Sequence, residues 1–317
     1  MMNDLLELMI CRITGLKGEE RLELGKKFKD RTDDFLKLSK WDIENILGRK
    51  ITGQSWKMSG IRCIAEEDAG NAEKLGIHRV CWREKRYPPL LREIFDPPLL
   101  LFYRGILPDP EKPLVAVVGT RKPSSQAASQ AFTLGRELGE AGIPVVSGLA
   151  LGIDAMAHRG NIEGKAPTVA VLGSGPDNVY PLSNRDLARR IIETGGVILS
   201  EYPPGTGPKK WNFPARNRII SALARGTVIV EAPGKSGALI TAHFALEHDR
   251  DLWVDSVGVT SSRGAGTAGL ADDGAKIISC AHDILAEWNM QLNQKVKIKK
   301  DGTDLVSSMA EYLDIKM

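Results

Sequence analysis

The chain has few of the residues that build disulfide frameworks and metal sites. Its four cysteines, Cys11, Cys63, Cys81 and Cys280, are scattered along 317 residues with no Cys-x-x-Cys pair and no metal-ligand spacing. We therefore expect reduced cysteines with structural roles, no bound metal and no other cofactor.

Long apolar runs are also missing. No segment approaches the length that crosses a membrane, and the first residues contain acids where a signal peptide would have cations. The sequence predicts a cytoplasmic protein with no membrane partner. Its net charge of +3 is small, so any nucleic-acid surface must be a local patch.

The first part of the chain, residues 1–70, carries apolar residues at helical spacing. Residues 5–13 and 22–28 flank a glycine turn at 15–18, and a further helical pattern covers 35–47. This predicts a small all-helical module with nothing catalytic in it. Two helices joined by a glycine turn can bind DNA backbone through the turn amides, although such pairs are more often packing units.

Residues 71–113 differ in composition and apolar pattern from the helical module. Proline pairs and short apolar runs between 77 and 104 indicate extended connector strands packed on a larger unit, and a segment rich in Pro and acid leads out of them.

Short apolar runs recur through residues 114–288, with helical stretches between them. Runs that lack polar alternation are buried on both faces, which is typical of parallel strands. The expected strands are at residues 114–118, 144–146, 168–172, 197–199, 227–230 and 252–254. The predicted fold class is α/β, with a doubly wound, mostly parallel sheet.

Small-residue turns follow these strands, and the carboxyl ends of parallel strands meet at one edge of the sheet, where helix N-termini and glycines favour phosphate. Arg121 comes directly after the turn Gly119-Thr120 and is placed to hold a phosphate; a surface salt bridge is the alternative. Lys235 and Ser236 resemble a phosphate cradle, but the Gly-Lys-Ser/Thr order of an ATP-hydrolysing loop is absent.

Residues 207–218 alternate cations with aromatic and amide side chains. Lys209 and Lys210 can neutralise phosphates while Trp211 or Phe213 offers a face for a base, although a basic solvated loop has a similar composition. The pattern predicts a contact segment at 209–213, followed by a helix from about residue 217. Arg216 and Arg218 would start this helix and hold neighbouring loops through acids.

Four polar residues are candidates for catalysis. Asp154 and His158 stand four apart on one predicted helix, but a helix N-terminal Asp is commonly a cap and no third ligand or nucleophile has suitable spacing nearby. Glu201 and Glu231 follow strands, where acids either act as bases or anchor loop amides and arginines. We favour structural roles for all four.

Together these motifs resemble the DNA-processing protein A family (DprA, also called Smf). The resemblance is strong from residue 114 to about 254 and weak in the connector, and the N-terminus resembles the family's sterile-alpha-motif-like module. It rests on residues 114–121, 147–154 with Ala157-His158, 170–175, Tyr180-Pro181 with Asn184, 200–203, 213–221 and 236–242.

The resemblance implies an extended Rossmann domain in a homodimer that binds single-stranded DNA. It also implies loading of the recombinase RecA onto that DNA during natural transformation, without catalysis. By motif match Arg121, Lys210 and Phe213 hold phosphates and a base. The full set of candidate DNA-binding residues is Arg121, Lys210, Phe213, Gly119, Thr120, Lys209, Gly148, Arg216, Asn217, Lys235 and Ser236.

The chain departs from the family pattern near its end. The loop at 255–275 matches loosely, and residues 289–317 form a short basic tail where many relatives carry a winged-helix domain. The basic run at 295–300 can add nonspecific DNA affinity, although a solvated charge run is the plainer interpretation. An alternative function is nucleotide binding or nucleoside-monophosphate cleavage on a related scaffold. Residues 233–238 lack the Pro-Gly-Gly-x-Gly-Thr turn and the following Glu of such enzymes.

Overall fold

The computed structural model describes residues 4–52 and 56–290. The basic run at 295–300 lies outside the described residues. The strands are β1 His78–Cys81, β2 Leu100–Gly105, β3 Val115–Val118, β4 Val145–Ser147, β5 Val169–Leu172, β6 Val197–Ser200, β7 Gly226–Ile229, β8 Asp251–Asp255 and β9 Lys276–Ile278. The helices are α1 Leu5–Arg12, α2 Gly18–Lys27, α3 Thr32–Leu36, α4 Lys40–Leu47, α5 Met58–Lys74, α6 Pro89–Arg92, α7 Ser125–Glu140, α8 Ile153–Glu163, η1 Leu182–Asn184 (3-10), α9 Arg185–Glu193, α10 Asn212–Leu223, α11 Gly237–Glu247, α12 Ser256–Thr260, α13 Ala265–Asp272 and α14 Ala281–Glu287.

Within the described residues, the strands join one nine-stranded sheet in the order β1-β2-β6-β5-β4-β3-β7-β8-β9. From β6 to β9 every neighbouring pair is parallel, while β1 and β2 are antiparallel additions at one edge. The predicted α/β class with a mostly parallel sheet is confirmed. The chain winds outward from β3 to β6 and then returns to place β7 on the other side of β3, which creates the topological switch point at which such sheets bind ligands.

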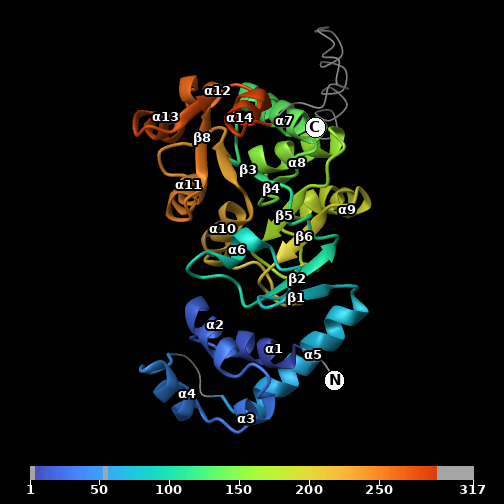
Figure 1. Ribbon diagram of the computed structural model, residues 1–317. Helices are drawn as coiled ribbons and strands as arrows, with labels where there is room; N and C mark the ends of the chain where they lie inside the picture. Colours follow the sequence, from blue (N-terminus) through green and yellow to red (C-terminus); the bar gives the residue numbers. More distant parts are fainter. Residues whose placement is uncertain (1–3, 53–55, 291–317) are drawn as a thin grey trace.

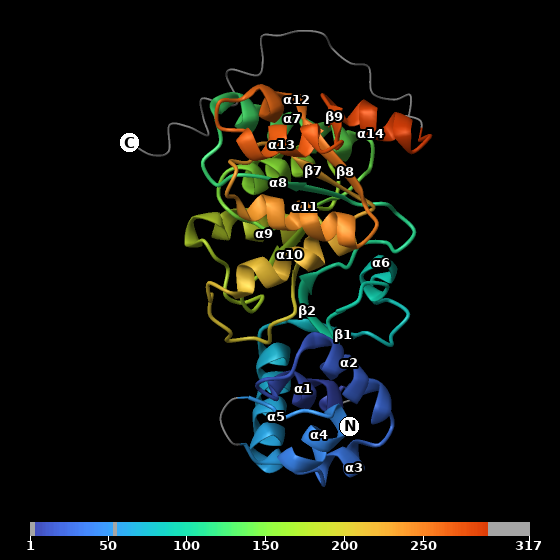
Figure 2. The same cartoon turned by 90° about the vertical axis from the view of Figure 1, so that its left-hand side faces the viewer.

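Helices cover both faces of the sheet, as Figures 1 and 2 show. Alternate residues of β3 divide between the two cores: Ala116 and Val118 pack toward α10 and α11, and Val115 and Val117 pack toward α7 and α8. All four are buried, which explains why this strand has no polar alternation in the sequence.

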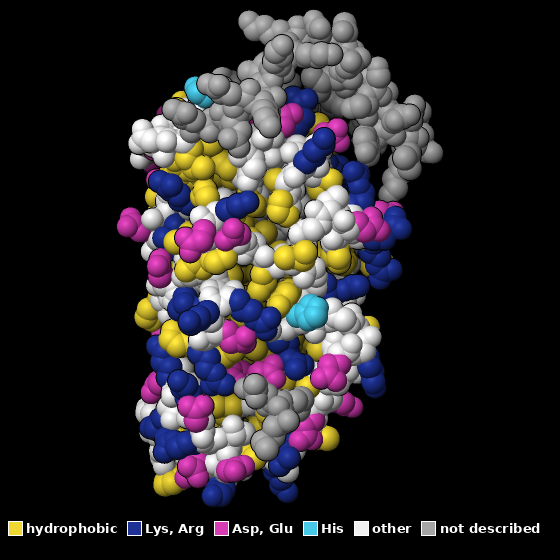
Figure 3. All heavy atoms as spheres, turned by 45° about the vertical axis from the view of Figure 1, so that its right-hand side comes forward, with side chains coloured by type: hydrophobic (Ala, Val, Ile, Leu, Met, Phe, Trp, Pro, Cys, Tyr) yellow, Lys and Arg dark blue, Asp and Glu magenta, His cyan; other side chains and the backbone are white. Residues whose placement is uncertain are grey.

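The helical module lies at one end of the molecule and packs on the hairpin of β1 and β2 (Figure 1). Leu100 and Phe102 face the module, whereas Leu101 and Tyr103 face the main core, so each side of β2 completes a different hydrophobic cluster. Over the module, cationic and anionic side chains are intermixed on the face drawn in Figure 3. No helix among the described residues combines the length and apolar character needed to cross a membrane.

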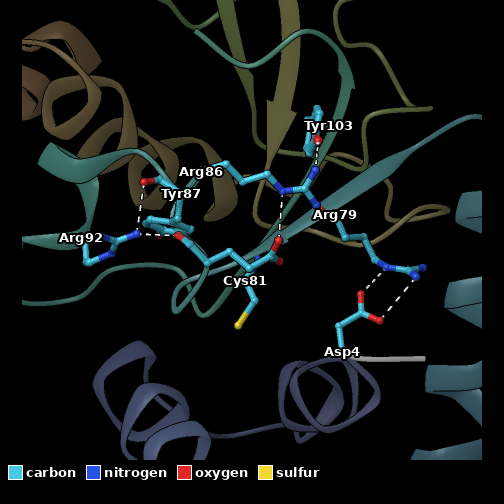
Figure 4. A network of polar contacts seen from close by, with 8 residues as sticks. Asp4, Arg79, Cys81, Arg86, Tyr87, Arg92 and Tyr103 are labelled. Atoms are coloured by element: carbon cyan, nitrogen blue, oxygen red, sulfur yellow. Dashed lines mark hydrogen bonds and ion pairs between the residues drawn. The ribbon is translucent and has the colours of Figure 1, made fainter. Parts of the chain in front are cut away.

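Polar contacts reinforce this junction (Figure 4). Arg79 of β1 pairs with Asp4 at the start of α1 at 2.5 Å, which joins the hairpin to the module, and on the other side of β2 Arg86 donates to the Tyr103 hydroxyl at 3.2 Å. The segment expected to be only extended also contains the short helix α6, which begins at Pro89. Proline is favoured in a first helical turn because its missing N–H has no partner there.

Candidate nucleic-acid interface

A cleft of about 970 Å³ opens at the carboxyl edge of the sheet, between the loops that follow β3 and β7. Its lining includes most of the candidate DNA-binding residues, namely Gly119, Thr120, Arg121, Lys210, Phe213, Arg216, Asn217, Lys235 and Ser236. Gly148 instead lines an adjoining hollow of about 50 Å³, and Lys209 lines neither. The fold therefore gathers side chains that are more than a hundred residues apart in the sequence.

The cleft is rich in unpaired positive charge. Its exposed cations are Arg121, Lys122, Lys210, Lys235 and Arg263, and within the described part of the chain no ion pair to a carboxylate engages them. The carboxylate in the lining, Asp154, is buried and accepts from the amide of Gly148 at 3.1 Å. Unneutralised cations around one concave surface favour a polyanion.

Phe213 lines the same cleft and lies next to one of these cations. The Arg121 Cζ atom lies 5.7 Å from the centroid of the Phe213 ring, and the Tyr180 ring centroid lies 5.6 Å from the same centroid. Gly173 makes room for the phenyl group, because a Cβ there would lie 3.1 Å from a Phe213 ring carbon. Arg121 and the Phe213 ring are therefore close enough for one nucleotide to contact both, with its phosphate on the guanidinium and its base on the ring.

Helix α10 positions several lining residues together. The sequence predicted its start near residue 217, and this was wrong: the helix begins at Asn212, whose side chain donates to the carbonyl of Gly173 at 2.9 Å. Pro214 does not prevent this, since proline is tolerated in the first turn. The earlier start gives Phe213, Arg216 and Asn217 helical spacing, so they project into the same cleft.

Arg216 forms part of the floor of the cleft. Its side chain is buried, and its Nη1 donates to the carbonyl of Val171 and, at 2.8 Å, to that of Gly148. Burial lowers the pKa of Arg216 to about 10, while Asp154 opposes the shift, so the guanidinium stays charged at neutral pH. Gly148 is needed for this arrangement because a Cβ there would lie 2.5 Å from Nη2 of Arg216.

The loop after β7 completes the opposite wall. Ser236 caps α11 by accepting from the amide of Ala238 at 3.3 Å, and Asn217 donates to the carbonyl of Gly237 at 3.1 Å. These bonds hold Lys235 and the N-terminus of α11 at the cleft. The positive end of the helix dipole adds to the anion-favouring field.

The acids considered for catalysis have structural partners. Glu201 pairs with Arg218 at 2.7 Å, as the sequence suggested, and Glu231 accepts from the amide and hydroxyl of Ser124 at 2.8 and 2.9 Å. His158 is buried against Thr168, and burial lowers its pKa to about 3. The predicted contact between Glu201 and Arg218 is present, and the structural interpretation of the other residues stays a prediction. Among the described residues, no group of three or more His, Cys, Asp or Glu side chains is arranged to hold a metal.

Comparison with known proteins identifies the family of this chain. The family model described as DNA recombination-mediator protein A matches residues 78–289. The chain belongs to this family. It is 39% identical over 241 residues to the protein Smf of Synechocystis, covering 75% of this chain and 59% of that relative. The chain thus spans less than two thirds of the length of that relative.

Two solved structures of the DNA recombination-mediator protein A family have the same fold. DNA processing protein A of Streptococcus pneumoniae superposes with a TM-score of 0.73 at 34% identity, covering 89% of this chain and 97% of that one. DNA processing protein A of Helicobacter pylori superposes with a TM-score of 0.59 at 30% identity, covering 67% and 95%, and is described for its single-stranded DNA binding mode. The resemblance inferred from the sequence is confirmed.

Among the lining residues that were not DNA-binding candidates from the sequence, three carry a cationic or aromatic side chain: Lys122, Tyr180 and Arg263. Lys122 directly follows Arg121, so its position was a usable signal. Tyr180 belonged to a family motif but received no role. Arg263 comes from the turn between α12 and α13, in the divergent loop, and no local pattern pointed to it.

Proposed function

We propose that the chain binds single-stranded DNA in this cleft, without catalysis, and delivers the strand to the recombinase RecA during DNA uptake and recombination. One observation carries the proposal: exposed cations with no carboxylate partner among the described residues line a single cleft of about 970 Å³ together with Phe213, and Arg121 lies 5.7 Å from its ring centroid. Single-stranded nucleic acid combines phosphates with flat apolar bases, and this pairing of cations and an aromatic face suits both.

The contacts divide between phosphate and base. Arg121 and Lys210, which line the same cleft, hold phosphates, and Lys235 beside the N-terminus of α11 holds another. A base stacks on Phe213. Arg216 and Gly148 stabilise the floor of the cleft, because the Arg216 guanidinium donates hydrogen bonds to two backbone carbonyls. Lys209 lies outside the cleft and makes a weaker, peripheral contact.

The absence of catalysis is part of the proposal. A nucleoside-monophosphate-cleaving enzyme needs a free, positioned carboxylate. Glu231 is buried and accepts hydrogen bonds from Ser124, and Glu201 is paired with Arg218. Incubation with nucleoside monophosphates is expected to release no base; release by the wild-type chain would contradict this part.

RecA and a second copy of this chain are the proposed protein partners, and membership of a recombination-mediator family supports both. Sedimentation at increasing concentration tests for the homodimer. RecA assembly on single-stranded DNA, with and without the chain, tests loading. A chain that binds DNA but leaves the assembly rate unchanged would contradict the loading role.

Binding through cations that neutralise phosphates depends on the salt concentration in a measurable way. Arg121→Ala and Lys210→Ala are each expected to weaken oligonucleotide binding and to lower the slope of log affinity against log salt by about 0.7, the value for one phosphate contact on a single strand. The measurement is fluorescence anisotropy over a series of salt concentrations.

Lys112→Ala is the matched control. This exposed lysine precedes β3, at the opposite edge of the sheet from the cleft. Lys112→Ala removes one positive charge, as Lys210→Ala does, but it removes no proposed contact with DNA. If Arg121→Ala and Lys210→Ala behave like Lys112→Ala, the DNA-binding role of the cleft is wrong.

A further inference from the structure

Tyr180 is an exposed aromatic residue beside the cleft that the family resemblance leaves without a role. Its side chain is 44% exposed, and its ring centroid lies 5.6 Å from that of Phe213, with the two planes tilted by 42°. It lines both the main cleft and the adjoining hollow, next to Arg121. No hydrogen bond to its hydroxyl is found within the described residues.

The segment that carries Tyr180 is firmly held. Asn184, four residues on, donates to the carbonyls of Leu149 at 2.9 Å and Ala150 at 3.2 Å, which ties this segment to the turn after β4. On the other side, the Ser174 hydroxyl donates to the carbonyl of Asn178 at 2.6 Å. The ring is therefore presented by a braced loop, and a ligand meets it with little ordering cost.

The surroundings of the ring suit a nucleotide. Leu151 and Leu182 are 45% and 61% exposed on the two segments that Asn184 joins. The hollow between Tyr180 and Phe213 has apolar walls and two guanidinium groups, those of Arg121 and Arg216. Apolar surface beside cations fits a ligand with a flat uncharged face and an anionic backbone.

We propose that Tyr180 is a second base-stacking residue, which takes the base next to the one stacked on Phe213. This proposal rests on the proposed function, because it assumes that the strand occupies the cleft. A single base between two rings needs parallel planes about 7 Å apart, twice the optimal carbon contact. The centroid separation of 5.6 Å and the tilt of 42° differ from that arrangement, so in this proposal each ring takes its own base and the strand bends between them.

The first experiment measures the affinity of Tyr180→Ala and Tyr180→Phe for oligothymidylate and for an abasic oligonucleotide of equal length and charge. Stacking is worth about 1–3 kcal/mol per base, so Tyr180→Ala is expected to weaken oligothymidylate binding about fivefold or more. On the abasic strand it is expected to bind like wild type, and Tyr180→Phe is expected to bind both strands like wild type. Equal losses on both strands would show a structural role only and would overturn the proposal.

The second experiment tests whether the two rings serve separate bases. Losses from Tyr180→Ala and Phe213→Ala are expected to multiply in the double variant, since the two contacts are independent. A double variant no weaker than Phe213→Ala alone would mean that both rings share one base, and would overturn the proposal. Failure of the proposed function is distinguishable, because then Arg121→Ala would leave binding to both strands intact.

Discussion

Gly148 provides a sharp test of how the floor of the cleft is built. In the substitution Gly148→Ala, the new Cβ would lie 2.5 Å from Nη2, 2.7 Å from Cζ and 2.8 Å from Nη1 of Arg216. Carbon atoms are rarely this close to any non-bonded atom, so the guanidinium must move. Movement weakens its hydrogen bonds to the carbonyls of Gly148 and Val171 and separates it from Asp154.

The expected cost follows from these contacts. Overpacking a well-packed interior costs about 1–3 kcal/mol, and a hydrogen bond that involves a charged group contributes about 1.5–3 kcal/mol. Because the side chain keeps part of its bonding after a small shift, we expect Gly148→Ala to lower the free energy of unfolding by about 2–4 kcal/mol. Denaturant unfolding followed by circular dichroism measures this, and DNA affinity falls with it because the floor beneath Phe213 is displaced.

A double-mutant cycle isolates the cause. In an Arg216→Ala background the guanidinium is gone, so adding Gly148→Ala is expected to cost less than about 1 kcal/mol, which gives a coupling energy in the upper part of the usual range for contacting residues. The alternative is that Gly148 matters because DNA approaches its backbone. In that case Gly148→Ala would lower DNA affinity without loss of stability and without coupling to Arg216, and the reasoning would be refuted.

Three further outcomes are expected. Glu201→Gln leaves the buried Arg218 with Asp96 as its acidic partner and is expected to lower unfolding free energy by about 3 kcal/mol, measured by denaturation, with DNA affinity unchanged. Burial raises the pKa of Asp255 from 3.8 to about 6, so its contribution to stability is fully present below about pH 4 and is lost as the pH rises from there through 6. About two pKa units correspond to about 3 kcal/mol, so Asp255→Asn is expected to gain about 3 kcal/mol on wild type over that interval, and a pH-independent difference would contradict this. Lys209→Ala is expected to weaken DNA binding less than Lys210→Ala, because Lys210 lines the cleft and Lys209 does not, and equal losses in anisotropy titrations would place both in the contact.

Local patterns in the sequence determined the elements of the main domain. Continuous apolar runs indicated the central strands, and the glycine turns after them indicated the ligand-binding edge of the sheet. Both signals are local, because the periodicity of apolar residues and the residue types of a turn depend on neighbours in the chain. Arg121 was recognisable for the same reason: it directly follows a buried strand, and every parallel strand ends at that edge. The antiparallel attachment of β1 and β2 had no such signal.

Only the tertiary structure decided which of these residues meet. Strand order places β3 beside β7, and this brings Arg121 to the same cleft as Lys235. Their meeting depends on the packing of distant segments and not on local spacing in the sequence. The burial of Arg216 under Gly148 and the approach of Tyr180 to Phe213 likewise depend on packing across the sheet edge. The sequence by itself determined the chemical types at the edge, and the fold determined which of them face the ligand and which support it, because long-range packing depends on the shapes of all the elements at once.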